Sequence, residues 1–277
     1  MMLLHCSVCG FDNPSGMRFC GNCGARLDEK TTPLRPRAIS EDRFGSDLIL
    51  SQMKDRIIQA GLEARGQRRN VTVLFVDLCD YTGLAEKVED EDLFCFLKLY
   101  IRMLADKVSH YEGVVDKVIG DGLMALFGAP IAFENTAERG VRAALDMLAG
   151  MDELNRQFSS QFRDSFHIHL GLHSGTVIIG GIGSNLDMDY TAIGDTVNLA
   201  RRLQEAAPPD TILVSDAVWR ATRALFDYRV VPDLSLKGIV RHLDAYALLG
   251  QKESKGNVRG LDGMFAPMIG REEELAV

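Results

Sequence analysis

The sequence predicts an α+β fold, in which a mixed β-sheet carries helices on one face. Runs rich in β-branched and aromatic residues, which favour strands, alternate with segments whose apolar residues recur at helical spacing. A Gly-Asp-Gly turn at 120–122 joins two strand-like runs directly, as in a hairpin, whereas helical segments separate other runs. This combination is typical of an α+β layer, and the chain shows no internal repeat.

The composition is that of a globular protein with one main domain and smaller appendages. Of its 277 residues, 46% are hydrophobic and 25% are charged, which is enough to bury a sizeable core. The formal net charge of -8 argues against general nucleic-acid binding but allows a local site for a small anion. No apolar run approaches the ~20 residues of a membrane span, and no signal-peptide pattern opens the chain, so we expect a cytoplasmic protein.

The first residues contain two Cys-x2-Cys pairs, Cys6 with Cys9 and Cys20 with Cys23. Two such knuckles present four thiolates tetrahedrally to one zinc ion, and a segment this short has no other core. The alternative is a pair of disulfides, which a cytoplasmic setting disfavours. We therefore expect a zinc ribbon over 1–27 that depends on structural Zn²⁺ and contacts protein rather than nucleic acid.

Two segments connect the ribbon to the main domain. A polar stretch with prolines over 28–46 predicts a linker. The next segment, 47–68, is expected to be helical because Leu50, Met53 and Ile57 recur at helical spacing. Such a seam either pairs with its copy or packs on its own domain, and the sequence does not choose between the two.

Alternating strand and helix patterns fill the main domain. Strands are expected over 71–76, 113–119, 123–127, 167–172, 176–180, 190–193, 211–214, 228–231 and 243–248. Four helices are expected in the main domain: one over the periodic segment that ends near residue 110, one after residue 135, one that includes 197–203, and one over 216–224.

Two of these helices carry N-cap signals. Asn135 is expected to cap its helix with Glu138 reaching back, as in a capping box. Asp195 is expected to cap the helix that contains Asn198.

Two aspartates lie where strands end. Asp77 directly follows a buried strand, and Asp121 lies at the tip of the hairpin. If these strands are neighbours, the two carboxylates meet at one edge of the sheet and can hold two hard cations such as Mg²⁺. The alternative is two ordinary turn or cap aspartates, which spacing does not exclude. Lys117 lies four residues before Asp121, and from the residues alone it can equally be a solvated lysine on one face of the sheet.

A second polar group surrounds the strand-to-helix turn after residue 193. Asn198 and Arg202 are four residues apart and share one helical face, with Thr191 just before the turn. They either converge on one ligand or serve as a capping residue and a surface ion-pair partner. From these residues alone, the second interpretation is favoured.

Four motifs follow one another in the main domain: V-T-V-L-F-V-D-L followed by Y-T, K-V-I-G-D-G-L-M-A-L-F-G-A-P, G-L-H-S-G-T-V-I-I-G, and Y-T-A-I-G-D-T-V-N-L-A-R-R-L. In order and spacing they resemble the catalytic domain of class III nucleotidyl cyclases, over 69–250. The resemblance implies a ferredoxin-like α+β domain and the activity of an adenylate cyclase, which forms cyclic AMP and pyrophosphate from ATP.

The resemblance also implies roles for the first polar group. Asp77 and Asp121 match the residues that bind two Mg²⁺ or Mn²⁺ ions, with the Leu78 carbonyl as a further ligand. Lys117 matches the residue that reads adenine, and guanylyl cyclases typically have an acidic residue there, so lysine favours ATP. Thr191 matches a second base-reading position. Threonine there is similar to the bicarbonate-responsive subclass, so bicarbonate is a candidate effector.

For the second group, the resemblance implies that Asn198 orients the ribose and that Arg202 stabilises the pentavalent phosphate. Lys237 resembles a lysine that contacts the triphosphate. In the family, metal-binding residues and base or transition-state residues come from opposite subunits. Because this chain has both sets, a head-to-tail homodimer with two equivalent sites is expected.

One residue departs from the family pattern. Asp80 stands where the family usually has glycine, in the loop expected to face the phosphates. Its carboxylate either weakens ATP binding, recruits metal or points to solvent. The alternatives to an adenylyl cyclase are a guanylyl or relaxed-specificity cyclase, and a catalytically silent cyclase-like regulatory module, for which Asp80 is the sole sequence support.

The tail over 251–277 ends in M-I-G-R-E-E-E-L-A-V, which resembles the opening of ATPase modules that follow such cyclases in longer proteins. No phosphate-binding G-x4-G-K-[ST] loop occurs before Val277. The chain is thus expected to be either a fragment of a longer protein or one that ends in an acidic helix.

Overall fold

The computed structural model describes residues 3–6, 11–14, 17–18, 20, 27, 66–81, 83, 90–159, 162, 164–184, 187–234 and 243–252. The predicted linker, most of the predicted helical segment and the tail beyond 252 lie outside these residues. One boundary differs from the prediction, because Gln67 and Arg68 begin a strand rather than end a helix.

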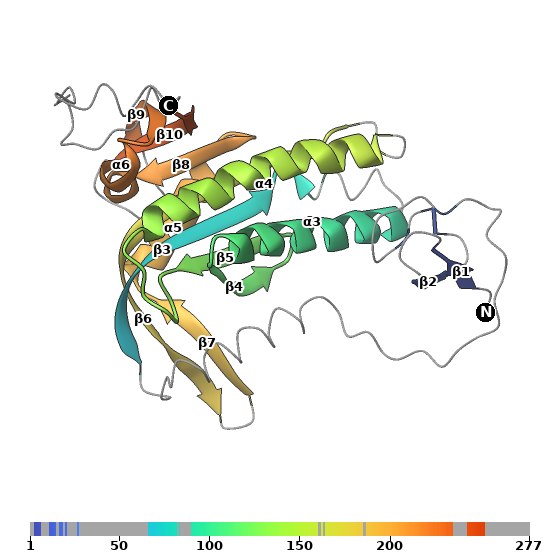
Figure 1. The fold of residues 1–277 in the computed structure, drawn as a ribbon, viewed down its shortest axis with the longest axis horizontal. Coiled ribbons are helices and arrows are strands. Elements are labelled where there is room, and N and C mark those ends of the chain that lie inside the picture. The colour runs from blue at the N-terminus through green and yellow to red at the C-terminus, as the bar shows by residue number, and fades with distance from the viewer. Residues whose placement is uncertain are drawn as a thin grey trace, which may run out of the picture.

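In the described part of the chain, eight strands form the main sheet, in the order β4-β5-β3-β6-β8-β10-β9, with β7 pairing with β6 (Figure 1). The strands are β3 Gln67–Leu78, β4 Val114–Ile119, β5 Gly122–Phe127, β6 Ile168–Ser184, β7 Asp187–Ile193, β8 Thr211–Ser215, β9 Phe226–Leu234 and β10 Leu243–Gln251. The helices are α3 Asp90–His110, α4 Thr136–Phe158, α5 Asp195–Ala206 and α6 Asp216–Thr222. The expected main-domain elements are all present, and the runs over 167–172 and 176–180 merge into β6.

The central strand β3 is buried on both faces. Leu74 and Val76 join a core cluster with buried side chains of α3 and α4. Val73 and Phe75 join a second cluster, which includes Ala200 of α5. The expectation that helices cover one face of the sheet is therefore wrong, because α5 lies on the face opposite α3 and α4. The physical reason is the run V-T-V-L-F-V, whose apolar residues do not alternate with polar ones, so both faces need a cover.

The long strand β6 connects the two halves of the sheet. Residues 168–179 pair antiparallel with β3, and residues 169–172 pair parallel with β8, so α5 is the helical crossover of a β-α-β unit. A Cβ atom at Gly171 would lie 2.2 Å from the backbone nitrogen of Gln204 in α5. The absence of a side chain at Gly171 thus allows α5, with Asn198 and Arg202, to lie directly on the sheet. Beyond β3, β6 continues with β7 as an arm that extends from the sheet (Figure 1).

Asn135 is the N-cap residue of α4, as predicted, but the predicted capping box does not form, and the predicted N-cap of α5, Asp195, is wrong. The side chain of Asn135 makes no capping hydrogen bond; its Oδ1 instead accepts a bond of 2.8 Å from Arg139 Nε. Glu138 pairs with Arg142, one turn later in α4, at 2.9 Å. The N-cap of α5 is Gly194, with φ 146, and Asp195 is the first helical residue. In α4, side-chain pairing within the helix replaces the predicted capping box. In α5, the tight turn after β7 places Gly194 rather than Asp195 at the N-cap.

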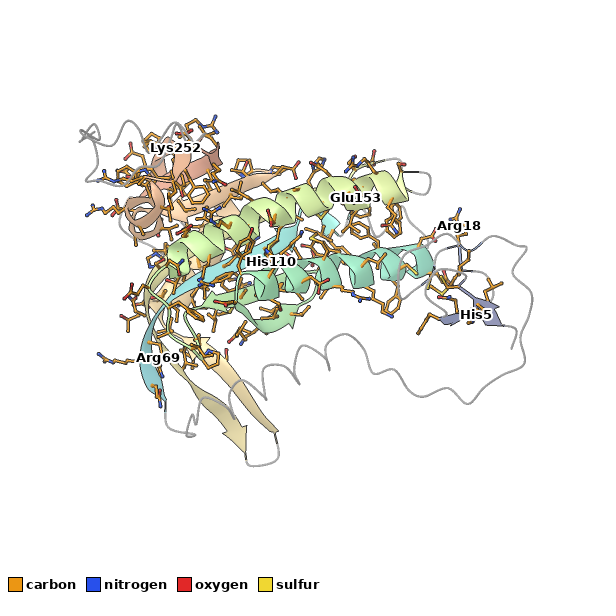
Figure 2. All side chains as sticks on the ribbon, in the orientation of Figure 1. His5, Arg18, Arg69, His110, Glu153 and Lys252 are labelled. Carbon is orange, nitrogen blue, oxygen red and sulfur yellow. The ribbon has the colours of Figure 1, made fainter. Side chains whose placement is uncertain are left out.

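The N-terminal residues lie against the beginning of α3. Strand β1, Leu3–His5, pairs with β2, Asp12–Pro14. Arg18 pairs with Asp92 of α3, and the Lys98 ammonium lies 5.4 Å from the centroid of the Phe11 ring. Figure 2 shows His5 and Arg18 at this end of the molecule. Among the described helices, none is both long and apolar enough to cross a membrane.

Candidate active site

The first cluster of predicted site residues lies where β3 ends. Pairing of β3 with β5 brings Asp77 beside the β4-β5 hairpin, whose tip carries Asp121. A Cβ atom at Gly122 would lie 2.7 Å from Asp77 Oδ1, so this glycine leaves the space that the carboxylate occupies. The pKa of Asp77 is raised to about 7, first by burial and then by the charge of Asp121 and a hydrogen bond between the two carboxyl groups. The predicted meeting of the two aspartates is therefore observed.

Two orphaned polar atoms mark the same cluster. Among the described residues, two buried side-chain atoms have no hydrogen-bond partner: Asp77 Oδ1 and the Tyr100 hydroxyl oxygen. Tyr100 is fully buried in α3, and after burial the charges of Asp77 and Asp121 contribute most to raising its pKa. The helical spacing that predicted α3 carries no signal that Tyr100 lies near the two aspartates.

The donor set fits a divalent cation. Two neighbouring carboxylates repel each other, and a buried carboxylate oxygen without a partner is costly, so both conditions are relieved by a hard cation that prefers oxygen ligands. The backbone amide of Leu78 hydrogen-bonds to Asp77 and lowers its pKa. The predicted role of the Leu78 carbonyl as a ligand stays a prediction.

The second cluster joins β4 to β7. The Thr191 hydroxyl donates a 2.8 Å hydrogen bond to Asp116 Oδ2, and the Ala192 backbone N–H donates a 3.2 Å bond to Asp116 Oδ1. Lys117 Nζ lies 3.4 Å from Asp116 Oδ2. The Asp116 side chain is 0% exposed and that of Lys117 is 42% exposed. The structure thus brings the two predicted base-reading residues to one buried carboxylate.

Asp116 was missed by sequence reasoning. It is the extra residue of a β-bulge, since Val115 pairs with Ala125 and Lys117 pairs with the next residue, Met124. A bulge re-aims side chains, so strand alternation does not reveal that Asp116 points inward. The available signal was an acidic residue within the apolar run V-V-D-K-V-I. Burial raises the pKa of Asp116, while the bonds from Thr191 and Ala192 and the charge of Lys117 act in the opposite direction.

The third group of predicted site residues, Asn198 and Arg202, lies on α5. Asn198 is exposed. Arg202 Nη1 pairs with Glu205 Oε2 at 2.5 Å, and Arg201 Nε pairs with Glu205 Oε1 at 3.1 Å. It is Arg201, not Arg202, whose charge lowers the pKa of Asp77. The described contacts therefore divide the predicted site residues into a metal cluster (Asp77, Asp121), a base cluster (Lys117, Thr191) and the α5 pair.

Three predicted site residues, Lys237, Cys9 and Cys23, lie outside the described residues. Cys6 and Cys20 are both buried in one small apolar cluster. Within the described ranges, no group of three or more His, Cys, Asp or Glu side chains is arranged to hold a metal ion. The predicted zinc ribbon therefore stays a prediction.

Asp80 adopts the conformation that a glycine would favour. Its φ of 51 lies in the left-handed region, which aspartate tolerates better than most residues. Its side chain is exposed, and its Oδ2 lies 2.7 Å from where a Cβ atom of Gly83 would be. The backbone shape of this loop thus accommodates aspartate at the position where the resembling family usually has glycine.

Known proteins match the same region. The model of the adenylate and guanylate cyclase catalytic domain matches residues 64–250. Adenylate cyclase 1 of Rhizobium meliloti is 30% identical over 186 residues, which are 66% of this chain and 28% of that protein. Adenylate cyclase of Anabaena cylindrica is 29% identical over 184 residues, 65% of this chain and 36% of that protein. This chain thus spans about a third of the length of these relatives.

Solved structures agree with these matches. The adenylyl cyclase CyaB from P. aeruginosa superposes with a TM-score of 0.66 at 30% identity, covering 69% of this chain and 100% of that chain. The guanylyl cyclase Cya2 superposes with a TM-score of 0.63 at 28% identity, covering 69% of this chain and 96% of that chain. Since the family match extends over more than half of its residues, the chain belongs to the adenylate and guanylate cyclase catalytic domain family.

Proposed function

We propose that this chain is an adenylyl cyclase, a phosphorus–oxygen lyase that converts ATP to 3',5'-cyclic AMP and pyrophosphate. The observation that carries the proposal is the presence of Lys117 and Thr191 at one buried carboxylate, in a chain of the cyclase family. An ammonium group at this position donates hydrogen bonds, as the N1 acceptor of adenine requires. The guanylyl cyclases that the chain resembles typically have an acidic side chain there. The relatives from Rhizobium meliloti and Anabaena cylindrica, both named adenylate cyclases, support the same choice.

The metal cluster supports the reaction through charge. In the proposed enzyme, Asp77 and Asp121 hold two Mg²⁺ or Mn²⁺ ions, and their charges reach the buried side chain of Tyr100. The chemistry such ions supply when bound is a lower pKa for the attacking 3'-hydroxyl and neutralisation of the leaving pyrophosphate. Asn198 would orient the ribose. Arg202 would stabilise the charge that grows on the α-phosphate, an effect worth a few kcal/mol for a positioned donor.

A head-to-tail homodimer completes the site in this proposal. Arg202 is paired with Glu205 in its own chain, and the positive charge that lowers the pKa of Asp77 comes from Arg201. Val118 and Ile119 on β4 and Ile178 and Ile193 on the β6-β7 arm are 40–51% exposed. These exposed apolar side chains lie beside the base cluster on β4 and β7 and on the neighbouring strand β6, as expected for an interface that a second copy covers.

The direct test is product formation by the purified protein with ATP or GTP, under Mg²⁺ or Mn²⁺. Cyclic AMP is expected as the main product. A preference for GTP would favour the guanylyl or relaxed-specificity alternative, and absence of both cyclic nucleotides would favour the silent regulatory module.

Complementation tests the shared site. Asp77→Ala and Arg202→Ala chains are each expected to be nearly inactive, because every site in either homodimer lacks one group. Mixing the chains restores one intact site in each heterodimer, so activity is expected to return to at most about a quarter of wild type for random pairing. A mixture that stays inactive although heterodimers form would overturn the shared-site arrangement.

The proposal has three further parts. Lys237 is proposed to contact the triphosphate, and residues 1–27 are proposed to form a zinc ribbon through Cys6, Cys9, Cys20 and Cys23. One zinc ion per chain is expected by elemental analysis, and loss of zinc binding on Cys9→Ser is the matching control.

Bicarbonate is proposed as an effector of this cytoplasmic enzyme. Cyclase activity that does not change with bicarbonate at constant pH would contradict this part of the proposal.

A further inference from the structure

The second buried aspartate, Asp116, has no part in the proposed reaction, yet it makes more polar contacts than any predicted site residue described above. Its side chain is fully buried, and both of its oxygens accept hydrogen bonds from β7. The same Oδ2 atom that accepts from Thr191 is 3.4 Å from the Lys117 ammonium. One carboxylate therefore contacts both residues that are proposed to read the base.

The direction of the Thr191 hydrogen bond restricts what this residue offers to a ligand. A hydroxyl has one hydrogen and two lone pairs. Because its hydrogen is donated to Asp116, the Thr191 oxygen can only accept from any further partner. Lys117, in contrast, can only donate. The pair thus presents one acceptor beside one donor.

This pattern complements adenine and opposes guanine. The six-position of adenine carries an amino group, which donates, and its N1 accepts; guanine has an accepting O6 and a donating N1–H. A buried polar mismatch discriminates strongly between related substrates, because the mismatched groups lose water without gaining a partner.

We propose that Asp116 is the specificity-determining positioning residue of this site: it holds the Thr191 hydroxyl as an acceptor and Lys117 beside it, so that the pair selects a 6-aminopurine over a 6-oxopurine nucleotide. The proposal rests on the proposed function, since it assumes that Thr191 and Lys117 face the base. Asp116 itself acts through these two residues.

The deciding variant is Asp116→Asn, measured as the ratio of kcat/KM for ATP to that for GTP. An amide NH₂ facing Thr191 donates to its oxygen, so the hydroxyl hydrogen becomes available to a ligand and now suits guanine O6. The ratio is expected to fall by at least about tenfold relative to wild type. Because both nucleotides are tested on one preparation, the fraction of folded protein cancels in this ratio.

Two controls separate positioning from structure. Asp146→Asn makes the same chemical change at another carboxylate that accepts from a hydroxyl, that of Tyr111 at 2.9 Å, and is expected to leave the ratio unchanged. In a Thr191→Val background, Asp116→Asn is expected to change the ratio much less, since the hydroxyl it controls is absent. Equal losses with ATP and GTP, or a full effect in the Thr191→Val background, would overturn the proposal.

Binding measurements cover the case of an inactive variant. The affinities of 3'-deoxy-ATP and 3'-deoxy-GTP, which lack the attacking hydroxyl, are expected to show the same change in ratio. Wild-type protein that forms neither cyclic nucleotide would contradict the proposed function. An active wild type with an unchanged ratio in Asp116→Asn would contradict the role of Asp116 alone.

Discussion

Asp77 and Asp116 are both acidic residues of the central sheet, but their surroundings are opposite. Among the described residues, neither the buried Asp77 Oδ1 nor the buried Tyr100 hydroxyl has a hydrogen-bond partner, and a second carboxylate, that of Asp121, acts on Asp77. Asp116 accepts two hydrogen bonds and has the Lys117 ammonium at 3.4 Å. Within the part of the chain that the structure describes, the Asp77 cluster thus has an unsatisfied carboxylate oxygen, whereas both oxygens of Asp116 have partners.

The difference separates two uses of a buried carboxylate. An unsatisfied polar group costs stability and persists where a ligand satisfies it in the working state. A satisfied network instead fixes the orientation of its members before any ligand arrives. The comparison therefore supports both proposals, that the Asp77 cluster binds a cation and that Asp116 positions Thr191 and Lys117. Mutations should affect activity most at the first and stability most at the second.

The largest effect is expected for Asp77→Asn. Loss of one charged ligand should lower cyclase activity by about a thousandfold or more, the scale on which electrostatic stabilisation of a transition state acts. In EDTA, which removes bound metal, the substitution should instead favour stability: as pH rises, wild type should lose free energy of unfolding relative to Asp77→Asn. Folding raises the pKa of Asp77 from its ordinary value of 3.8 to about 7, so the stability that the protonated group contributes is lost as pH rises through this window.

The measurement is the free energy of unfolding of wild type and Asp77→Asn in EDTA at pH values from about 4 to about 8. Wild type should lose stability relative to the variant as pH rises, and Mg²⁺ or Mn²⁺ should reverse this loss only in wild type. Parallel pH profiles of wild type and variant, with equal stabilisation of both proteins by metal, would show that Asp77 does not bind the metal.

Asp116→Ala is expected to lower the free energy of unfolding by about 2–4 kcal/mol. The Thr191 hydroxyl and the Ala192 N–H would lose their acceptor inside the protein, and each unsatisfied buried donor costs about 1–3 kcal/mol. Urea unfolding measures the change, and Asp77→Ala in EDTA provides the comparison. The contrast between the two clusters fails if Asp77→Ala is the more destabilising of the two.

The smallest effect is expected for Tyr100→Phe. Because the Tyr100 hydroxyl has no partner among the described residues, its removal in EDTA should leave stability unchanged or raise it by about 1 kcal/mol. Tyr228→Phe is the matched control, since the Tyr228 hydroxyl lies 2.6 Å from Thr222 Oγ1, and it should lose about 1 kcal/mol. Thermal unfolding of both variants compares them, and equal losses would show that the Tyr100 hydroxyl is satisfied.

Local sequence signals predicted much of this arrangement. The run V-T-V-L-F-V predicted β3, and the Gly-Asp-Gly turn predicted the β4-β5 hairpin and the position of Asp121 at its tip. These predictions succeeded because strand propensity and turn chemistry act over a few residues. The resemblance to cyclases then assigned Asp77, Lys117 and Thr191 to roles that the residues alone left open.

Other features were missed where they depend on distant partners. The capping box expected at Asn135 is replaced by its bond to Arg139, and Glu138 pairs with Arg142. Asp116 pairs with residues 75 and 76 positions away in the chain, and a bulge reverses the side-chain alternation that would have flagged it. The prediction that helices cover only one face of the sheet failed for the same reason, because α5 packs through Ala200 on residues of β3 that are distant in the chain.

The sequence by itself determined the order and type of the main-domain elements and, through its motifs, the family. These properties follow from local conformational preference and from residues at short fixed spacings. Only the tertiary structure decided that Asp77 is left unsatisfied beside Asp121 while Asp116 holds Thr191 and Lys117. Burial and pairing across the sheet create that difference, because a buried carboxylate stabilises or destabilises the fold according to the donors and charges that folding brings to it.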